Sequence, residues 1–258
     1  MTTLYAPAAA PMTLTPPPLA RLALIELRKA VDTRAGRWLL VLIGLVAVAG
    51  AAITAVTDPA SNHNVPHVLG DTSQLVAVLL PVLGILLVTS EWSQHTALTT
   101  FTLVPQRSRI IAAKVAAGVL LAAAATVVCV AVTAVVLVAA DHGQAGLWHD
   151  AGRAIGYALV FQILNLLLGV GFGLLFRNTP VAVVVYFVIP TAWSILTSAV
   201  SALTATGRWL DPSVAWNHLA GGTMTATTWA QAATTAAVWI ALPALAGGWR
   251  VLHRPVDA

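Results

Sequence analysis

Six long apolar stretches lie between Trp38 and Trp249, and none of them has an Asp, Glu, Lys or Arg in its interior. A helix needs about 20 apolar residues to cross the hydrocarbon core of a bilayer. Only 9% of the residues are charged, whereas about 25% are charged in a typical soluble domain. The sequence therefore predicts an all-α polytopic membrane protein with six transmembrane helices, at about residues 38–57, 71–90, 110–140, 154–176, 181–203 and 229–247.

Lysine and arginine residues concentrate in alternate gaps between these stretches. One side holds Arg21, Arg28, Lys29, Arg34, Arg37, Arg107, Arg109, Lys114, Arg177, Arg250 and Arg254, whereas the other side holds Arg153 and Arg208. Because cytoplasmic loops carry the excess of Lys and Arg, this asymmetry predicts that the N and C termini are both cytoplasmic. The basic residues follow the membrane edges, so we expect lipid headgroups as their partners and no nucleic acid.

The N-terminal region divides into a tail and an amphipathic segment. Residues 1–18 are rich in proline and predict a disordered cytoplasmic tail, followed by one six-helix domain over residues 19–258. From Leu19 to Val31 apolar residues recur at helical spacing, with Arg21, Arg28 and Asp32 opposite them. We predict a helix that lies along the cytoplasmic membrane surface. It is either a simple anchor or a connecting helix that also contacts a cytoplasmic partner.

The most patterned gap runs from Glu91 to Lys114 and mixes threonine, aromatic and basic residues. Pro105 interrupts it, which predicts a short helix, then a turn over residues 105–108, and re-entry into the membrane at about Ile110. Lys114 is expected to extend its ammonium group back to the headgroups. Glu91 is either an ordinary interfacial charge or an anchor that binds backbone donors of the turn.

Glycines and prolines inside the spans predict packing and bending. Gly169 and Gly173 are four residues apart, so they share a helix face and allow close approach of another helix. That face packs tightly within the chain, or it belongs to a subunit interface or a substrate groove. Pro81, Pro190 and Pro243 each fall inside a span and predict a static bend or a hinge.

The two longer external gaps carry aromatic and histidine residues. In the gap at residues 204–228 we expect short helices that dip into the outer leaflet, with Trp209 and Trp216 at the boundary of water and lipid. His63 and His67 have the spacing of a zinc pair on a helix. We favour ordinary loop histidines and predict no metal site.

Sequence motifs for catalysis are missing. The only lysines are Lys29 and Lys114, and neither follows a glycine-rich phosphate-binding turn. The sequence also lacks a zinc-protease helix, a nucleophile elbow and a pair of carboxylates inside the membrane. We predict that the chain is no enzyme and binds no cofactor. A gradient-driven carrier or channel is disfavoured, because such proteins use ionisable residues within the membrane.

Three stretches together carry a family resemblance. They are Glu26-Leu27-Arg28-Lys29 with Thr33-Arg34; Glu91-Trp92 followed by Thr96, Thr99-Thr100, Pro105, Arg107, Arg109 and Ala113-Lys114; and Leu242-Pro243 with Gly247-Gly248-Trp249-Arg250 and Arg254-Pro255-Val256. In their order and placement they resemble the six-span permease subunits of ATP-binding cassette exporters, in particular the actinobacterial branch of the drug-exporter type. The resemblance covers the chain from about Leu19 onward.

The resemblance implies a transport subunit in a bacterial plasma membrane. The gap after the second span would form a coupling helix that docks on a separate ATP-binding subunit, through Glu91, Trp92, His95, Thr96, Thr99, Thr100, Pro105, Arg107 and Arg109. Arg21, Glu26, Arg28 and Lys29 would belong to the interfacial helix, and the gap before the sixth span would cap the pathway. Such permeases pair, so we expect a homodimer or a heterodimer with a second permease.

The resemblance implies export, powered by the partner ATPase. Spans rich in Val, Leu, Ala, Phe and Trp favour an amphipathic or hydrophobic compound as the substrate. The alternatives are an accessory or immunity-type membrane protein without transport activity, and a carrier that works without a gradient. Only Arg107 and Arg109 are strongly basic within the coupling stretch, which leaves the choice of ATPase open.

Overall fold

The computed structural model describes residues 17–59, 63–93, 107–140 and 146–253. Within these ranges every regular element is a helix. Six helical segments are long and apolar enough to cross a membrane: Arg34–Thr57, Val65–Trp92, Ser108–Ala140, Ala151–Phe176, Thr179–Ala199 and Ala226–His253. The prediction of an all-α protein with six helices suited to cross a membrane is confirmed.

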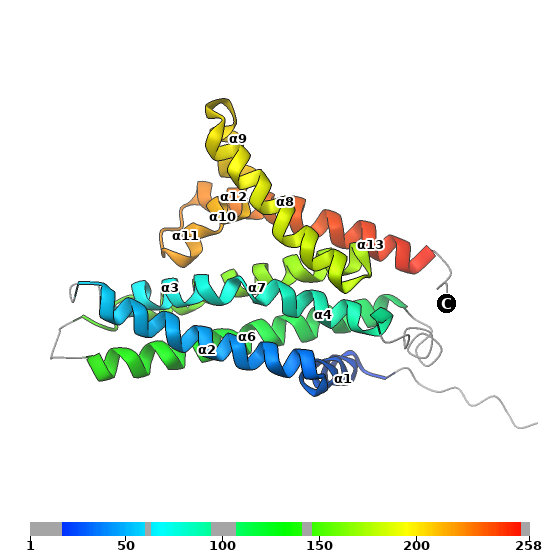
Figure 1. Cartoon of the computed structure of the whole chain (residues 1–258), viewed down its shortest axis with the longest axis horizontal. Coiled ribbons are helices and arrows are strands. Elements are labelled where there is room, and N and C mark those ends of the chain that lie inside the picture. Colours follow the sequence, from blue (N-terminus) through cyan, green and yellow to red (C-terminus); the bar gives the residue numbers. More distant parts are fainter. Residues whose placement is uncertain (1–16, 60–62, 94–106, 141–145, 254–258) are drawn as a thin grey trace, which may run out of the picture.

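The chain runs through these helices in order (Figure 1). The first half contains α1 (Leu19–Asp32), α2 (Arg34–Thr57), α3 (Val65–Ala77), α4 (Leu80–Ser93), α6 (Arg107–Ala140) and α7 (Ala151–Phe176). The second half contains α8 (Thr179–Ala199), η2 (Ser201–Leu203), α9 (Thr204–Leu210), α10 (Pro212–Ala215), α11 (Asn217–Ala220), α12 (Ala226–Ala236), the π-helical segment η3 (Ala237–Ala241) and α13 (Leu242–His253). Both ends of the described chain lie at the same end of the bundle.

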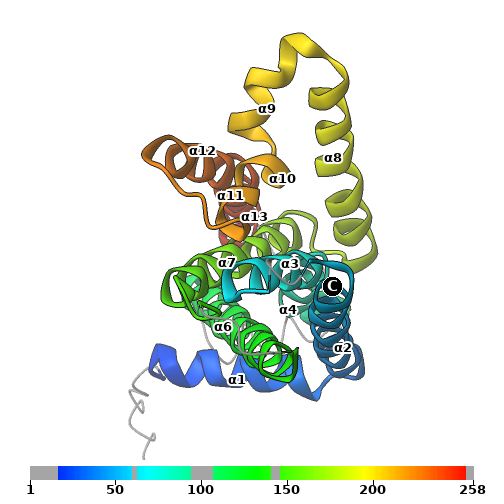
Figure 2. The same cartoon turned by 90° about the vertical axis from the view of Figure 1, so that its left-hand side faces the viewer.

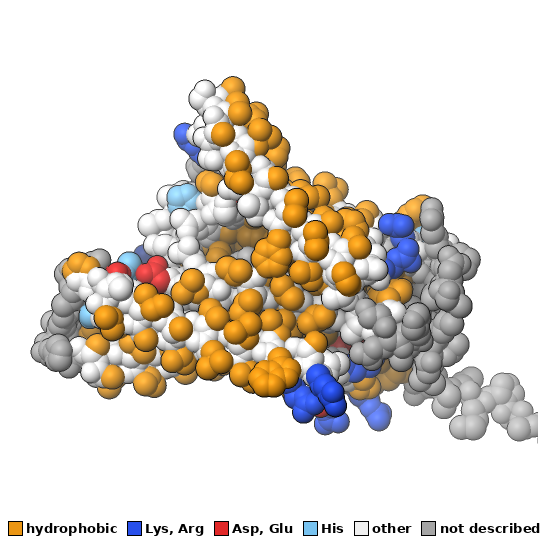
Figure 3. All heavy atoms as spheres, in the orientation of Figure 1, with side chains coloured by type: hydrophobic (Ala, Val, Ile, Leu, Met, Phe, Trp, Pro, Cys, Tyr) orange, Lys and Arg blue, Asp and Glu red, His pale blue; other side chains and the backbone are white. Residues whose placement is uncertain are grey.

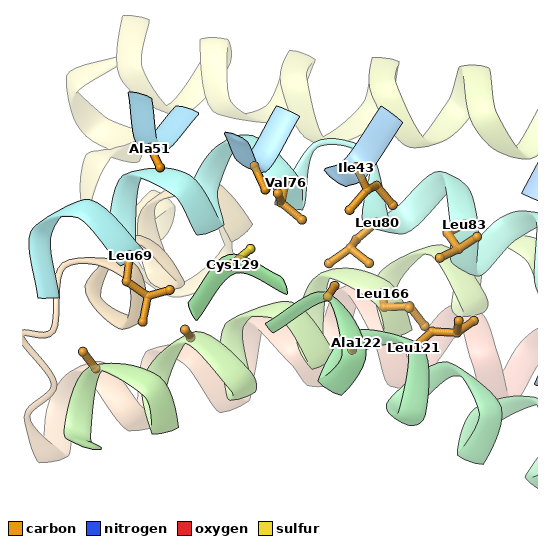
Figure 4. Packing of buried hydrophobic residues seen from close by; sticks show 14 of the residues in the cluster. Ile43, Ala51, Leu69, Val76, Leu80, Leu83, Leu121, Ala122, Cys129 and Leu166 are labelled. Atoms are coloured by element: carbon orange, nitrogen blue, oxygen red, sulfur yellow. The ribbon is translucent and has the colours of Figure 1, made fainter. Parts of the chain in front are cut away.

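A central bundle of α2, α3, α4, α6 and α7 holds the main apolar core. Figure 4 shows Ile43 of α2, Val76 of α3 and Leu80 of α4 directed toward the space shared with α6 and α7. Leu166 of α7 is fully buried there. The second span and α7 are the most enclosed, since 67% and 61% of their apolar windows are buried. They form the centre around which the other helices pack.

The C-terminal helices form a second, more open unit. In Figures 1 and 2, α8 and α9 project away from the bundle, and in Figure 2 α12 lies on the far side of α10 and α11 from α8. Trp216 and Phe172 belong to a separate apolar cluster that joins this unit to α7. Only 17% of the apolar window is buried in α8 and in the sixth span. These two spans therefore offer most of their surface to lipid or to another protein.

The second and third spans begin earlier than predicted. Asn64 accepts a hydrogen bond from the backbone N–H of His67 at 3.0 Å, and this cap starts α3 at Val65 rather than at residue 71. Likewise, α6 begins at Arg107, so residues 107 and 108 belong to a helix and not to the predicted turn. The membrane boundary near Ile110 stays a prediction. The predicted short helix before Pro105 lies outside the described residues.

The three intramembrane prolines have different effects. At Pro81 the second span breaks: α3 ends at Ala77, and α4 restarts at Leu80 after a turn at residues 78 and 79. At Pro190, by contrast, α8 continues without a break. Pro243 follows the π-helical segment η3 in the sixth span. The predicted bend is therefore clearest at Pro81.

The gap before the sixth span contains the expected short helices, α9, α10 and α11. The prediction for Trp216 was wrong, because its side chain is only 1% exposed. Its indole Nε1–H donates to the carbonyl oxygen of Ala232 at 3.3 Å, so it fixes α10 and α11 against α12. Trp209 is 41% exposed and remains a candidate for the membrane boundary.

Candidate functional site

Four charged side chains meet at the end of the bundle where α1 crosses the other helices. Glu26 and Lys29 come from α1, Glu91 from α4 and Lys114 from α6. Lys114 Nζ lies 2.5 Å from Glu26 Oε2 and 3.3 Å from Glu91 Oε2. Lys29 Nζ lies 2.7 Å from Glu26 Oε1 and 2.8 Å from Glu91 Oε1. We call this arrangement the ionic cluster; each lysine contacts both carboxylates.

Three of the four members of the ionic cluster are buried. The side chains of Glu26, Glu91 and Lys114 are 7%, 4% and 3% exposed, whereas that of Lys29 is 41% exposed. Lys114 also donates to the carbonyl oxygen of Leu87 at 3.1 Å. A buried charge is costly unless it is paired and hydrogen-bonded, and two carboxylates with two ammonium groups meet that condition. The four residues thus depend on one another.

The two carboxylates raise the pKa of Lys29, the half-exposed member of the ionic cluster. Burial on its own would lower the pKa of Lys29, but hydrogen bonds to Glu26 and Glu91 outweigh this effect. The pKa of Lys29 therefore lies above its usual value. Lys29 stays protonated and closes the cluster on its water-facing side.

These findings correct two predictions. Lys114 does not extend to the headgroups, because its ammonium group is buried between two carboxylates. Glu91 is no ordinary interfacial charge: its carboxylate binds Lys29 and Lys114. Periodicity alone missed this pairing because Glu26 lies 88 residues before Lys114 in the chain.

The ionic cluster lies where the two helices that border the predicted coupling segment, α4 and α6, come together with α1. Glu91 lies three residues before residue 94, where the chain leaves the described range, and Lys114 lies in the second turn of α6. Arg109, also in α6, donates from Nη2 to the carbonyl oxygen of Pro17 at 2.7 Å, just ahead of α1. The two helices that border residues 94–106, α4 and α6, are therefore both bound to α1 or to the residue just before it.

Of the other predicted coupling residues, two lie in described helices and the rest lie outside the described residues. Trp92 is half-buried and packs against the main core next to Glu91. Arg107 is the first residue of α6. His95, Thr96, Thr99, Thr100 and Pro105 lie outside the described residues.

The helix predicted from Leu19 to Val31 is formed as α1, but its faces differ from the expectation; its position on the membrane surface stays a prediction. Arg21 and Arg28 are exposed, as expected. Leu22, Ala23 and Glu26 are the buried residues, and they face α6 and the bundle. Leu24 and Ile25 are 54% and 43% exposed. One side of α1 is thus fixed to the bundle through charged as well as apolar groups, and the apolar side chains available to lipid are on another side.

The glycine face of α7 packs within the chain. A Cβ atom placed on Gly169 would overlap the carbonyl group of Pro81, and one on Gly173 would lie 3.0 Å from Cβ of Val88. Gly84 of α4 faces α7 in the same way. The tight-packing alternative is therefore confirmed, and this face is not open to a second subunit or a substrate.

A cleft of about 240 Å³ separates α8 from the bundle. Its aromatic wall includes Phe161, Tyr186 and Trp216, and Pro190 also lines it. The polar groups along the cleft are uncharged: Gln74, Asn165, Thr191, Ser213 and Asn217. The cleft can hold an apolar or aromatic molecule and offer it a few hydrogen bonds.

The histidine pair considered from the sequence does not share a helix. His63 precedes α3, whereas His67 lies within it. His67 instead contacts Asp58 and Asp71.

No protein-family model matches this sequence, and no curated protein matches it either.

Proposed function

We propose that this chain is the membrane subunit of an ATP-binding cassette exporter, driven by a separate ATPase that binds the loop at residues 91–109. The observation that carries the proposal is the ionic cluster. It ties α1 to α4 and α6, the two helices that border this segment. A push on the segment would therefore move these three helices together.

The distribution of charge supports a cytoplasmic position for this end. In Figure 3 most of the visible Lys and Arg side chains lie at the end of the molecule near α1 and the C-terminal helix, and a belt of hydrophobic side chains separates them from the opposite end. By the positive-inside rule the basic end faces the cytoplasm, with both termini. In this orientation α1 lies at the inner membrane surface of the proposed bacterial plasma membrane.

The cleft beside α8 supports an amphipathic or hydrophobic substrate. It contains aromatic side chains and uncharged polar groups, and α8 has few contacts that would prevent it from moving. Because α4 packs against α7 and α8, which both line the cleft, a movement transmitted through α4 would change the shape of the cleft. The poorly buried faces of α8 and the sixth span also support pairing with a second permease, either a copy of this chain or a different one.

A gradient-driven carrier is the second candidate, and the ionic cluster is also the observation that favours it. Ionisable groups within a membrane often form proton relays. However, the cluster lies at one end of the bundle, and each carboxylate has two ammonium partners. Transport by the purified chain in liposomes without ATP and without a partner would establish this function in place of the exporter.

The direct test of the exporter is recovery of the ATPase. The native chain is purified from its own membranes after cross-linking through single cysteines introduced at residues 99–106. We expect a nucleotide-binding protein to be recovered in stoichiometric amount. Cysteines introduced on the opposite side, for example at Arg208 of α9, serve as the matched control. If the cytoplasmic positions never recover an ATPase, the proposal is wrong.

Charge reversal at both Arg107 and Arg109 should uncouple transport from ATP hydrolysis. The double change R107E/R109E removes the hydrogen bond from Arg109 to the carbonyl oxygen of Pro17. It also replaces two positive charges with two negative charges at the proposed docking surface. Since like charges that face each other across an interface cost several kcal/mol, transport should fall by about tenfold or more. Substrate-stimulated ATP turnover is the measurement.

The control for this prediction is R208E, which reverses an exposed arginine of α9. It should leave turnover unchanged. Equal membrane levels of both variants would show that insertion is intact. Unaltered substrate-stimulated turnover in R107E/R109E would contradict the predicted role of this surface.

A further inference from the structure

A second group of charged residues lies at the opposite end of the bundle, between α2 and α3. Nε2 of His67 lies 2.5 Å from Oδ2 of Asp58 and 3.6 Å from Oδ2 of Asp71. One donor atom from each of the three residues lies within 4.8 Å of the others. The three side chains are partly exposed, so an ion from the solvent can reach them.

Local structure explains why the three residues meet. Asp58 directly follows the last residue of α2. Asn64 caps α3, and this cap sets the position of His67 and Asp71, which are one helical turn apart. The connection between α2 and α3 is short enough to bring both helix ends together. Sequence analysis considered only the two histidines and so missed the carboxylates.

His63 adds an observation independent of these contacts. Its Nε2 is buried and has no hydrogen-bond partner among the described residues. A ligand imidazole needs a free nitrogen. The Nε2 atom of His63 is such a nitrogen.

We propose that Asp58, His67 and Asp71 bind a divalent transition-metal ion of the zinc class at the external end of the first two spans, close to His63. Imidazole together with carboxylate suits zinc, whereas calcium and magnesium prefer sites made of oxygen alone. The proposal is independent of the exporter function. Because the ligands come from two helices, the ion would hold the external ends of α2 and α3 together.

The competing explanation is an ion pair between His67 and Asp58 with Asp71 nearby. In a zinc site the imidazole nitrogen bonds the metal at about 2.0–2.1 Å and no longer contacts the carboxylate directly. The two explanations differ in whether the purified chain takes up metal.

The test is a calorimetric titration of the purified full chain, without a polyhistidine tag and after treatment with a chelator, with zinc chloride alone. We expect one zinc ion to bind per chain. H67A should lower the affinity by about 100-fold or more, and D71N by about 10-fold or more, because even residues that only support a ligand contribute 10- to 100-fold. Magnesium and calcium at the same concentrations should not compete.

H149A is the matched control. His149 is also outside the spans and also pairs with a carboxylate, Asp150, at 3.2 Å, but its side chain is 82% exposed. The change should leave zinc binding as in the unmodified chain. If the unmodified chain binds no zinc saturably, or if H67A and D71N bind it as well as H149A does, the metal site is refuted.

Thermal unfolding provides a second measurement that does not depend on any one variant. Zinc should raise the melting temperature of the unmodified chain and of H149A, because an ion that binds only the folded state stabilises it. At the same zinc concentration the rise should be clearly smaller in D71N, which keeps the pair between His67 and Asp58. An equal rise in D71N would overturn the assignment of Asp71 as a ligand.

Discussion

Gly169→Ala should destabilise the folded protein by about 2–3 kcal/mol, in the range measured for overpacked cores. The added methyl group would overlap the backbone carbonyl of Pro81. A backbone group cannot turn away as a flexible side chain can, so α4 and α7 must separate. These two helices form the most extensive helix contact in the described structure, and the loss would extend along it. The measurement is the free energy of unfolding in mixed micelles titrated with a denaturing detergent.

Gly156→Ala is the matched control because it adds the same atom to the same helix. No atom lies within 4 Å of the position that its Cβ would take. Alanine favours the helix over glycine by up to about 1 kcal/mol. The control should therefore leave stability unchanged or raise it. Equal losses in the two variants would show that the destabilisation arises from the helix itself and not from the contact with Pro81.

This pair of glycines also shows how far sequence analysis could reach. The spacing of Gly169 and Gly173 correctly identified a face for close approach. It could not identify which helix approaches, because composition is similar in all six spans. In the structure the partner is α4, whose Pro81 and Gly84 both lie against α7. Local pattern predicted the face, and tertiary structure determined its partner.

The ionic cluster, by contrast, could not be predicted from local sequence patterns. Sequence analysis assigned Glu91 and Lys114 to the edges of a polar gap, where charged residues are common and need no partner. Their burial depends on Glu26, which comes from a helix that hydrophobic spacing assigned to the membrane surface. A contact between residues so distant in the chain leaves no local signal. The one sequence signal for this contact was that Glu26 lies on the same side of its helix as the apolar residues Leu22 and Ala23.

Lys114→Met should have the largest effect of any change in the ionic cluster, a loss of about 3–5 kcal/mol of stability, as found when one partner of a buried pair is removed. It leaves Glu26 and Glu91 buried with one ammonium group between them, that of Lys29. Methionine fills a similar space, so the cost arises mainly from the unbalanced charge. Unfolding in mixed micelles again measures the change.

Lys29→Met is the graded control. Its side chain is 41% exposed, so water can take over part of its role. A half-exposed pair contributes about 1 kcal/mol or less, and the loss should be correspondingly small. The order of the two losses separates burial from charge, because each change removes one ammonium group from the same two carboxylates.

The double variant Glu26→Gln/Lys114→Met tests the balance of charge itself. Removing one carboxylate along with one ammonium group leaves the pair of Lys29 and Glu91, 2.8 Å apart. If charge balance governs the ionic cluster, the double variant should be more stable than Lys114→Met, even though it lacks one more native charge. If it is less stable, Lys114 acts through its packing and its bond to Leu87, and α1 is not held to α6 by charge. A double variant that regains stability but still fails to couple transport to ATP hydrolysis would link the ionic cluster to force transmission rather than to folding alone.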